Sequence, residues 1–135
     1  MDAQKLDFED NTFDVVISRN LTWNLEHPDV AYREWVRVLK AGGRLLNFDA
    51  NWYGYLYEEE QRKAYENDRK NVENNSLDDH YLCTDIERME RIALQVPLSK
   101  ISRPRWDVKT LREAGLLGIR TDTEIWKRSG VRKKD

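Results

Sequence analysis

The chain has 135 residues, a net charge of −2 and a charged fraction of 36%, and it most simply forms one domain spanning residues 1–135. This slightly acidic balance argues against a nucleic-acid binder, and no apolar stretch approaches the roughly 18 residues of a membrane-spanning helix. The single cysteine, Cys83, excludes an internal disulfide and a Cys-rich metal site, so with the absence of a signal-peptide pattern it predicts a cytoplasmic protein without a bound metal.

The first strong pattern is a strand followed by a helix. Residues 13–18 (FDVVIS) contain three consecutive β-branched residues, which predict a parallel strand buried on both faces. A polar loop follows, and Pro28 then begins a predicted helix that runs to Lys40 with one apolar stripe. Gly42 or Gly43 can take the left-handed conformation that ends such a helix.

A second apolar run, residues 44–49 (RLLNFD), predicts a second buried strand. Strand, helix and strand in this order form a right-handed crossover unit of an α/β sheet. Because such sheets bind ligands beyond the carboxyl ends of their parallel strands, we expect the site at residues 18–20 and 49–52. We call these two segments the carboxyl rim.

The next part of the chain predicts a helical insertion, residues 55–97, after an aromatic cluster at residues 52–57. Residues 58–75 are strongly charged and predict an exposed helix. Thr84 forms a capping box with Glu87, and this box begins a second helix that Pro97 ends. Just before it, one histidine beside two aspartates, at His80, is too little to predict a metal site.

The last part predicts one more helix and one more strand. Asp107 is expected to cap a helix that Gly115 ends, and residues 119–126 alternate loosely between apolar and polar, as a strand does. The basic tail, residues 127–134, is interpreted as a solvated terminus.

Three motifs together resemble the second half of a class I S-adenosylmethionine-dependent methyltransferase domain of type 11. They are Asp2-Ala3, Phe13-Asp14 before an apolar strand, and the run RVLKAGG at residues 37–43. The resemblance implies a partial Rossmann-like α/β fold, in which a short, mainly parallel sheet is flanked by helices. In this family the helical insertion usually lies over the substrate pocket.

The family's Gly-rich loop, which wraps the cofactor, would precede Asp2 and is not among these residues. We therefore expect a domain truncated at both ends, with weak or absent binding of S-adenosylmethionine by the isolated chain. Methyl transfer to a small-molecule acceptor would then require the missing N-terminal half. The alternative is a non-catalytic remnant that forms a homodimer through its open sheet edges.

The resemblance also assigns the cofactor residues. It implies that Asp2 and the backbone of Ala3 bind the adenine, and that Arg19 and Asn20 lie beside the methionine part. The competing interpretations are a frayed terminus for Asp2, a surface ion pair for Arg19 and a turn residue for Asn20.

The residues that could contact the methyl acceptor are assigned from their position in the predicted fold. Trp23, Trp52 and Tyr53 lie beyond the strand ends, where they either wall an apolar substrate pocket or belong to the core. Methyl transfer from a sulfonium mainly requires alignment of the reacting atoms, so no catalytic triad is expected. Asp49 and Glu26 are candidates for a general base if the acceptor must lose a proton, although Asp49 could instead make structural hydrogen bonds.

Overall fold

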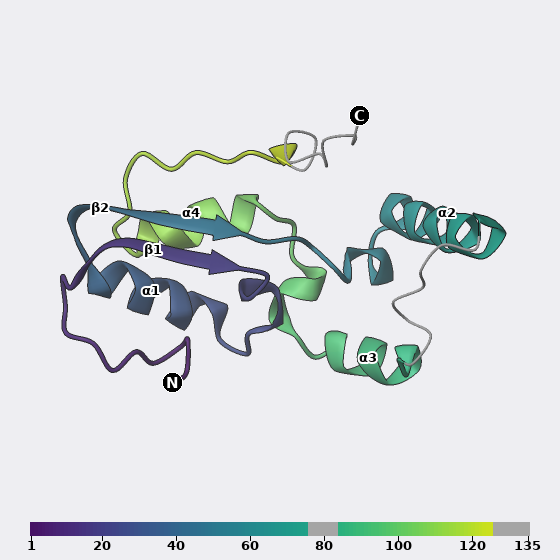
Figure 1. The fold of residues 1–135 in the computed structure, drawn as a ribbon, viewed down its shortest axis with the longest axis horizontal. Coiled ribbons are helices and arrows are strands. Elements are labelled where there is room, and N and C mark those ends of the chain that lie inside the picture. Colours follow the sequence, from purple (N-terminus) through teal and green to yellow (C-terminus); the bar gives the residue numbers. More distant parts are fainter. Residues whose placement is uncertain (76–83, 126–135) are drawn as a thin grey trace, which may run out of the picture.

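The structure, a computed structural model, describes residues 1–75 and 84–125 (Figure 1). Its helices and strands follow one another in the order β1 (Phe13–Arg19), α1 (Pro28–Val38), β2 (Leu39–Phe48), α2 (Glu59–Asn75), α3 (Ile86–Ala93) and α4 (Arg105–Glu113). Three short 3-10 helices connect them: η1 (Thr22–Asn24), η2 (Gly54–Leu56) and η3 (Pro97–Lys100). His80, Cys83 and the basic tail lie outside the described residues.

The two strands are parallel neighbours, as predicted. Ile17 of β1 pairs with Leu46 of β2, and the pairing runs to Arg19 opposite Phe48. Both strands therefore end at the same edge, where the chain leaves β1 toward η1 and leaves β2 toward η2. The partial Rossmann-like α/β fold, a short parallel sheet flanked by helices, is confirmed.

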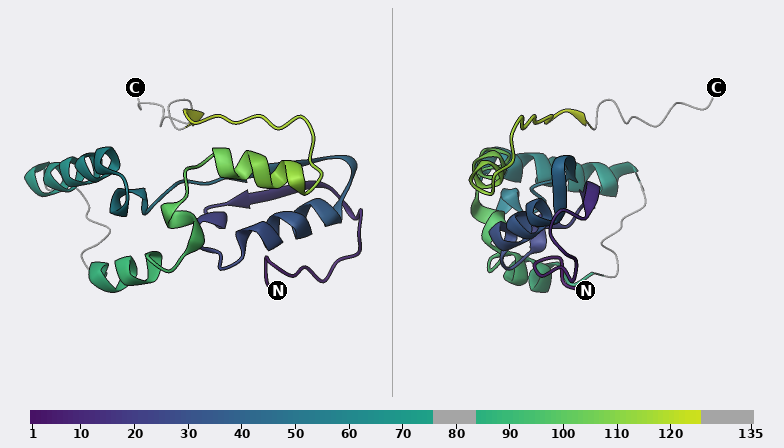
Figure 2. Two further views of the ribbon diagram at one scale, coloured as in Figure 1. Left: turned by 180° about the vertical axis from the view of Figure 1, so that it is seen from behind. Right: turned by 90° about the vertical axis from the view of Figure 1, so that its left-hand side faces the viewer.

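Helix α1 packs an apolar stripe against one face of this sheet. Pro28 occupies its first turn, where a missing backbone N–H costs nothing, and Ala31, Trp35 and Val38 are buried. Helix α4 lies on the same side of the sheet as α1 (Figure 2). The buried core joins these elements and comprises Leu25, Ala31, Tyr32, Trp35 and Leu111.

The prediction that the strands are buried on both faces is wrong for the described residues. The side facing away from α1 and α4 leaves Val15 47% and Ile17 66% exposed, with Leu46 and Phe48 similarly exposed beside them. The alternate residues, such as Val16, point into the core. The apolar run identified a strand suited to burial on both sides, but the described helices cover only one side.

Gly42 and Gly43 do not end the helix, which corrects a second prediction. Helix α1 stops at Val38 and β2 begins at Leu39, so both glycines lie inside β2. The register is irregular there, because Phe13 pairs with Leu39 whereas Val15 pairs with Arg44. Gly42 has φ +80°, a left-handed conformation that lets the strand bulge and re-enter the ladder.

The predicted exposed helix is present as α2, but the cap of α3 is shifted by one residue. The carboxylate of Asp85, and not the hydroxyl of Thr84, accepts the backbone N–H of Arg88 at 2.9 Å. The capping box with Glu87 is therefore wrong, because the helix begins at Ile86 and places its third backbone N–H on Arg88. The extent of the insertion, residues 55–97, stays a prediction.

Two expectations near the C-terminus are also wrong. Asp107 lies inside α4, which begins at Arg105, and its carboxylate binds other side chains in place of the helix backbone. Residues 119–125 form no strand, since this exposed segment has no strand beside it to pair with, and Trp126 lies outside the described residues. Among the described residues, no helix has both the length and the apolar character needed to cross a membrane.

Candidate functional site

The carboxyl rim is built by a sharp turn after β1. Asn20 has φ +50°, and its backbone N–H donates to the carbonyl of Phe48 at 2.8 Å, so the chain turns at the end of β2. The indole Nε1–H of Trp23 then donates to the carbonyl of Asn20 at 3.2 Å. The loop after β1 is thus held against the end of β2, and the two predicted rim segments are brought together.

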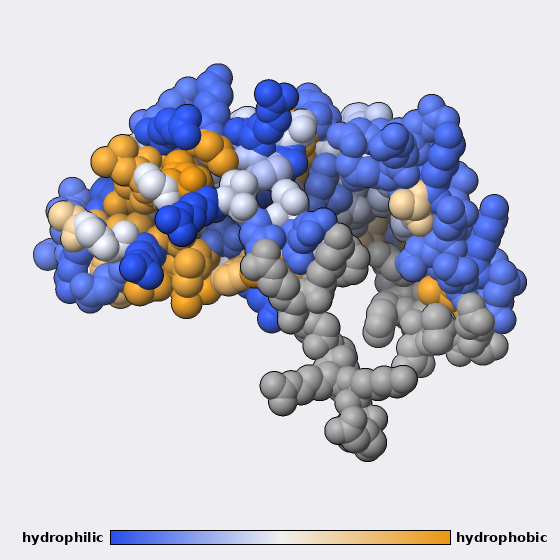
Figure 3. All heavy atoms as spheres, turned by 90° about the horizontal axis from the view of Figure 1, so that it is seen from above, coloured by the Kyte–Doolittle hydropathy of each residue, from blue (hydrophilic) through white to orange (hydrophobic). Residues whose placement is uncertain are grey.

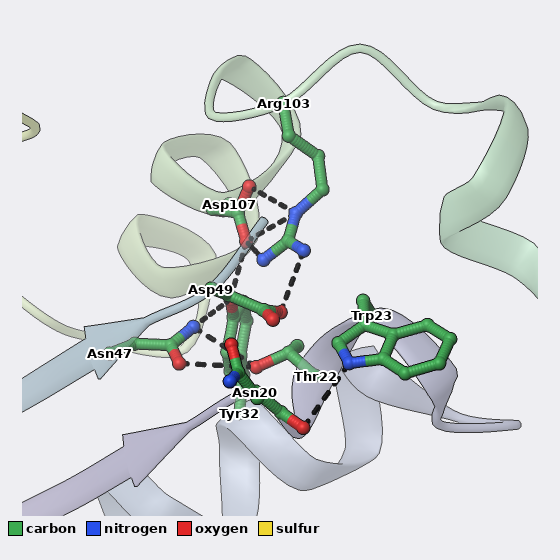
Figure 4. A network of polar contacts seen from close by, with 8 residues as sticks. All are labelled: Asn20, Thr22, Trp23, Tyr32, Asn47, Asp49, Arg103 and Asp107. Atoms are coloured by element: carbon green, nitrogen blue, oxygen red, sulfur yellow. Dashed lines mark hydrogen bonds and ion pairs between the residues drawn. The ribbon is translucent and has the colours of Figure 1, made fainter. Parts of the chain in front are cut away.

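A buried arginine joins the rim to α4 (Figure 4). Arg103 Nη1 donates to Asp49 Oδ2 at 2.7 Å, while its Nε and Nη2 donate to the carboxylate of Asp107. Burial alone would lower the pKa of the Arg103 guanidinium, but the hydrogen bonds and charges of Asp107 and Asp49 raise it overall. Arg103 is therefore a permanent cation shared between two carboxylates.

The network continues beneath the sheet through a tyrosine and an amide. The hydroxyl of Tyr32 donates to Asp107 Oδ1 at 2.5 Å and accepts from Asn47 Nδ2 at 2.9 Å. Asn47 Nδ2 also donates to the hydroxyl of Thr22 at 3.0 Å. Burial, followed by the charge of Asp107, raises the pKa of Tyr32 well above its ordinary value, so this hydroxyl stays protonated.

Two buried polar atoms at the rim have no hydrogen-bond partner within residues 1–75 and 84–125. They are Asp49 Oδ1 and the hydroxyl of Ser18, and both sit where the two strands end. Both atoms are almost inaccessible to solvent, and an unpartnered buried polar group in a protein marks the place of a water, an ion or a functional group.

The cofactor residues implied by the resemblance lie in two segments, one before β1 and one at the end of β1. The side chain of Gln4 accepts the backbone N–H of His27 at 2.6 Å, which holds the segment of Asp2 and Ala3 beside the start of α1. Both hydrogen bonds on the Asp2 carboxylate come from Gln4 and reach Oδ1, so among the described residues Oδ2 has no donor. The Gln4 backbone N–H and then its side chain lower the pKa of Asp2, which keeps an anionic acceptor available.

The other predicted cofactor residues differ in the contacts that they make. The carbonyl of Ala3 already accepts the indole N–H of Trp35 at 2.9 Å. The side chain of Arg19 is exposed, and in the described part of the chain it forms no ion pair or hydrogen bond. The surface ion pair considered for Arg19 is therefore not found there, whereas Asn20 does occupy a turn.

The aromatic residues form a row along the rim. The ring of Trp23 lies 5.6 Å from that of Tyr53, which lies 6.0 Å from Tyr55, and Tyr55 stacks on Tyr65 at 4.1 Å. The hydroxyl of Tyr55 also donates to Glu90 of α3 at 2.9 Å. Trp52, by contrast, is 50% exposed and makes no ring contact with the described aromatic residues.

The two general-base candidates are not equivalent. Asp49 is buried in the network, whereas Glu26 lies on an exposed turn with its carboxylate 3.8 Å from His27 Nε2. No cluster of three or more His, Cys, Asp and Glu side chains in the described ranges is arranged to hold a metal ion.

Several residues of the site were not predicted from the sequence, namely Arg103, Tyr32, Asn47, Tyr55 and Tyr65. Arg103 had one available signal, because it precedes Asp107 by four residues, the spacing of a helical ion pair. Its contact with Asp49 crosses 54 positions and had no local signal.

Comparison with known proteins places residues 1–47 in a methyltransferase domain family. The ubiquinone/menaquinone biosynthesis C-methyltransferase UbiE of Pseudomonas putida is 53% identical over 45 residues, which are 33% of this chain and 18% of that protein. The UbiE of Burkholderia multivorans is 43% identical over 67 residues, 48% of this chain and 25% of that protein. The UbiE of Chromobacterium violaceum is 47% identical over 53 residues, which are 38% of this chain and 22% of that protein.

The alignments thus span only about a fifth to a quarter of these relatives. No solved structure matches the chain. The matched residues hold β1, α1 and most of β2, and the parallel pairing of the two strands agrees with the family's fold. Residues 1–47 therefore match a methyltransferase domain, which agrees with the predicted resemblance to class I S-adenosylmethionine-dependent methyltransferases.

Proposed function

We propose that this chain supplies the acceptor side of a site for S-adenosylmethionine-dependent methyl transfer, and that it works with a Gly-rich cofactor-binding half that its 135 residues do not contain. The observation that carries the proposal is the carboxyl rim. There, two parallel strands of the family's fold end beside buried polar groups that have no partner among the described residues.

In this proposal the cofactor supplies an activated methyl group on a positively charged sulfur. The residues of this chain hold the reactants in line, which is the main requirement of the reaction. The exposed carboxylate of Asp2 accepts from the adenine amine, and the Ala3 backbone contributes there. Arg19 and Asn20 lie beside the methionine part.

The acceptor would be a small molecule that contacts the aromatic row. The rings of Trp23 and Tyr53 lie 5.6 Å apart and Trp52 is exposed, so these aromatic side chains would suit an apolar or aromatic acceptor. Asp49 Oδ1 would accept a hydrogen bond or a proton from the acceptor, while Arg103 fixes the carboxylate through Oδ2. The family match ends at residue 47, before the aromatic row, so the relatives' names do not identify the acceptor.

Calorimetric titration with S-adenosylhomocysteine, the demethylated product, tests this function. The chain alone should bind weakly or undetectably, and the chain fused behind the Gly-rich half of the P. putida relative should bind measurably. In the fused protein Asp2→Ala should weaken binding about tenfold, the loss expected for one charge-assisted hydrogen bond. Asp7→Ala, which changes an exposed aspartate, is the control. A folded fusion that binds nothing, or that is indifferent to Asp2→Ala, would contradict the proposal.

A second candidate is a non-catalytic interaction module that forms a homodimer. It is favoured by the two-stranded sheet, because among the described residues each strand leaves one edge unpaired. Sedimentation equilibrium distinguishes it: a monomer at all concentrations up to the millimolar range would remove the homodimer.

A further inference from the structure

The loop after β1, residues 20–25, turns at the end of the sheet that faces α2 (Figure 1). Seen from above, apolar residues gather over the strands and hydrophilic residues over α2 (Figure 3). Leu25 is buried in the core and Leu21 packs against the core, so apolar contacts hold the loop near the sheet. Such contacts have no preferred direction, and they do not by themselves set how the loop presents Asn20.

A buried hydroxyl gives the loop a directional contact with the sheet. Thr22 is fully buried, and its hydroxyl meets the side chain of Asn47 on β2. Asn47 Nδ2 donates to Thr22 Oγ1 at 3.0 Å, and the Thr22 hydroxyl donates to Asn47 Oδ1 at 3.3 Å. Asparagine is uncommon inside strands, where a β-branched side chain packs better. Its position in β2 therefore indicates a role other than packing.

The direction of these hydrogen bonds is fixed from the far end of the network (Figure 4). The carboxylate of Asp107 can only accept, so the Tyr32 hydroxyl donates to it. The oxygen of Tyr32 then accepts, and Asn47 Nδ2 supplies that bond at 2.9 Å. This requirement orients the amide of Asn47, whose nitrogen also donates to Thr22. Groups on α1, β2 and α4 thus hold the loop in one orientation.

The same network also holds the second segment of the carboxyl rim. Arg103 binds Asp107 and Asp49 together, so a continuous series of hydrogen bonds joins Thr22 to Asp49. The loop that contains Asn20 and the carboxylate of Asp49 are therefore fixed relative to each other. In-line methyl transfer depends on such alignment, since a small displacement of either reactant slows the reaction strongly.

We propose that Thr22 and Asn47 are positioning residues for methyl transfer, which set the orientation of the loop that contains Asn20. This inference rests on the proposed function, because the orientation of the loop matters for catalysis only if the cofactor lies beside it. In this role neither residue touches the cofactor or the acceptor, and both act through the loop.

Hydrogen exchange of two matched backbone amides tests the positioning in the chain itself. The Asn20 N–H donates to the Phe48 carbonyl at the carboxyl end of β1, at 2.8 Å. The Thr12 N–H donates to the Val38 carbonyl just before β1, also at 2.8 Å. Thr22→Val, which replaces the hydroxyl with a methyl group, should speed exchange at Asn20 about tenfold and leave Thr12 unchanged. Thr22→Ser, which keeps the hydroxyl, should leave both rates unchanged.

Two further variants complete this test. Asn47→Leu should act as Thr22→Val does, because it removes the amide at similar volume. Thr110→Val makes the same change at a buried threonine of α4 that the network does not include, and it should leave the ratio of the two rates unchanged. Equal acceleration at Asn20 and Thr12 in Thr22→Val would overturn the proposal, since the hydroxyl would then contribute only to overall stability. An unchanged rate at Asn20 would overturn it as well.

Binding of S-adenosylhomocysteine by the fused protein described above is the second readout. Thr22→Val should weaken this binding about fivefold to tenfold, and Thr22→Ser should bind as the unsubstituted fusion does. Unchanged binding by Thr22→Val would overturn the positioning role. A fusion that binds nothing before any substitution contradicts the proposed function instead, and the exchange rates of the chain alone still decide whether Thr22 and Asn47 set the loop.

Discussion

Arg103 donates from Nη1 to Asp49 Oδ2 at 2.7 Å, across 54 positions of the chain, and both side chains are more than nine-tenths buried. This contact ties the end of β2 to the segment that precedes α4. It places a positive charge beneath the carboxyl rim, where Asp49 was considered as a general base. Asp49 therefore has a structural partner whatever its role toward a ligand.

Replacement of Arg103 by alanine should destabilise the fold strongly. The change leaves the carboxylates of Asp49 and Asp107 buried without their shared cation, and the loss of one partner from a buried ion pair costs about 3–5 kcal/mol. Urea denaturation should show this decrease in the free energy of unfolding. Arg103→Lys should recover only part of it, because a single ammonium cannot reproduce the forked geometry that reaches both carboxylates.

Arg33 provides the matched control. It also pairs with an aspartate four residues away, Asp29 at 2.8 Å, but both side chains are exposed. Arg33→Ala should therefore cost no more than about 0.5 kcal/mol. Equal effects at Arg33 and Arg103 would show that the buried network contributes no more than a surface pair.

This network shows which parts of the fold and of the candidate site can be predicted from the sequence. The crossover unit, the parallel strands and the position of the rim follow from local periodicity and from the family's motifs, and the structure agrees with each. Arg103 could not be placed, because a local pattern does not reveal which distant carboxylate a long side chain will meet. The pairing with Asp49 depends on the path through α2 and α3, which local periodicity does not determine.

Tyr32→Phe should destabilise the same network by about 1–3 kcal/mol, the cost of leaving buried polar groups without a partner. The hydroxyl donates to Asp107 and accepts from Asn47, and phenylalanine can do neither. Tyr57→Phe is the control, because Tyr57 is exposed and its hydroxyl makes no hydrogen bond with the described residues. Thermal unfolding of both variants checks the difference, and an unchanged melting temperature for Tyr32→Phe would contradict it.

Acid should weaken the fold partly through Glu34. Its carboxylate accepts from Arg37 at 2.8 Å and from the backbone N–H of Leu6 at 3.0 Å, and these bonds lower its pKa from 4.5 to about 2. Because the folded pKa lies below the ordinary one, the stability from ionised Glu34 is complete above about pH 5. It is lost as the pH falls toward 2.

Glu34→Gln should therefore cost about 1–2 kcal/mol near neutral pH, and this difference from the unsubstituted chain should shrink as the pH falls from 5 to 2. Urea denaturation at several pH values measures it. Glu60→Gln, at an exposed position of α2, should show no such pH dependence. A difference at Glu34 that stays constant with pH would mean that its ion pair and hydrogen bonds do not stabilise the fold.

The glycines show a different limit of the sequence. A Gly-Gly pair after a helical pattern commonly ends the helix, and the same freedom of φ also permits a bulge inside a strand. Which of the two occurs depends on the neighbouring strand. Here the chain pairs with β1 from Leu39 onward, so Gly42 and Gly43 lie within β2.

Alanine at these two glycines should therefore have different effects. At Gly42 a Cβ would meet nothing within 4 Å, so Gly42→Ala should cost only the strain of φ +80°, about 1–2 kcal/mol. At Gly43 a Cβ would lie 2.9 Å from the carbonyl oxygen of Lys40 and 3.1 Å from that of Asp14. Since backbone atoms of both strands would have to move, Gly43→Ala should cost about 1–3 kcal/mol and also disturb the start of the pairing.

Hydrogen exchange of the β1 and β2 amides distinguishes the two variants. Faster exchange should appear across both strands for Gly43→Ala and stay near the bulge for Gly42→Ala. The same local pattern in both variants would show that the close approach of the strands at Gly43 is not required.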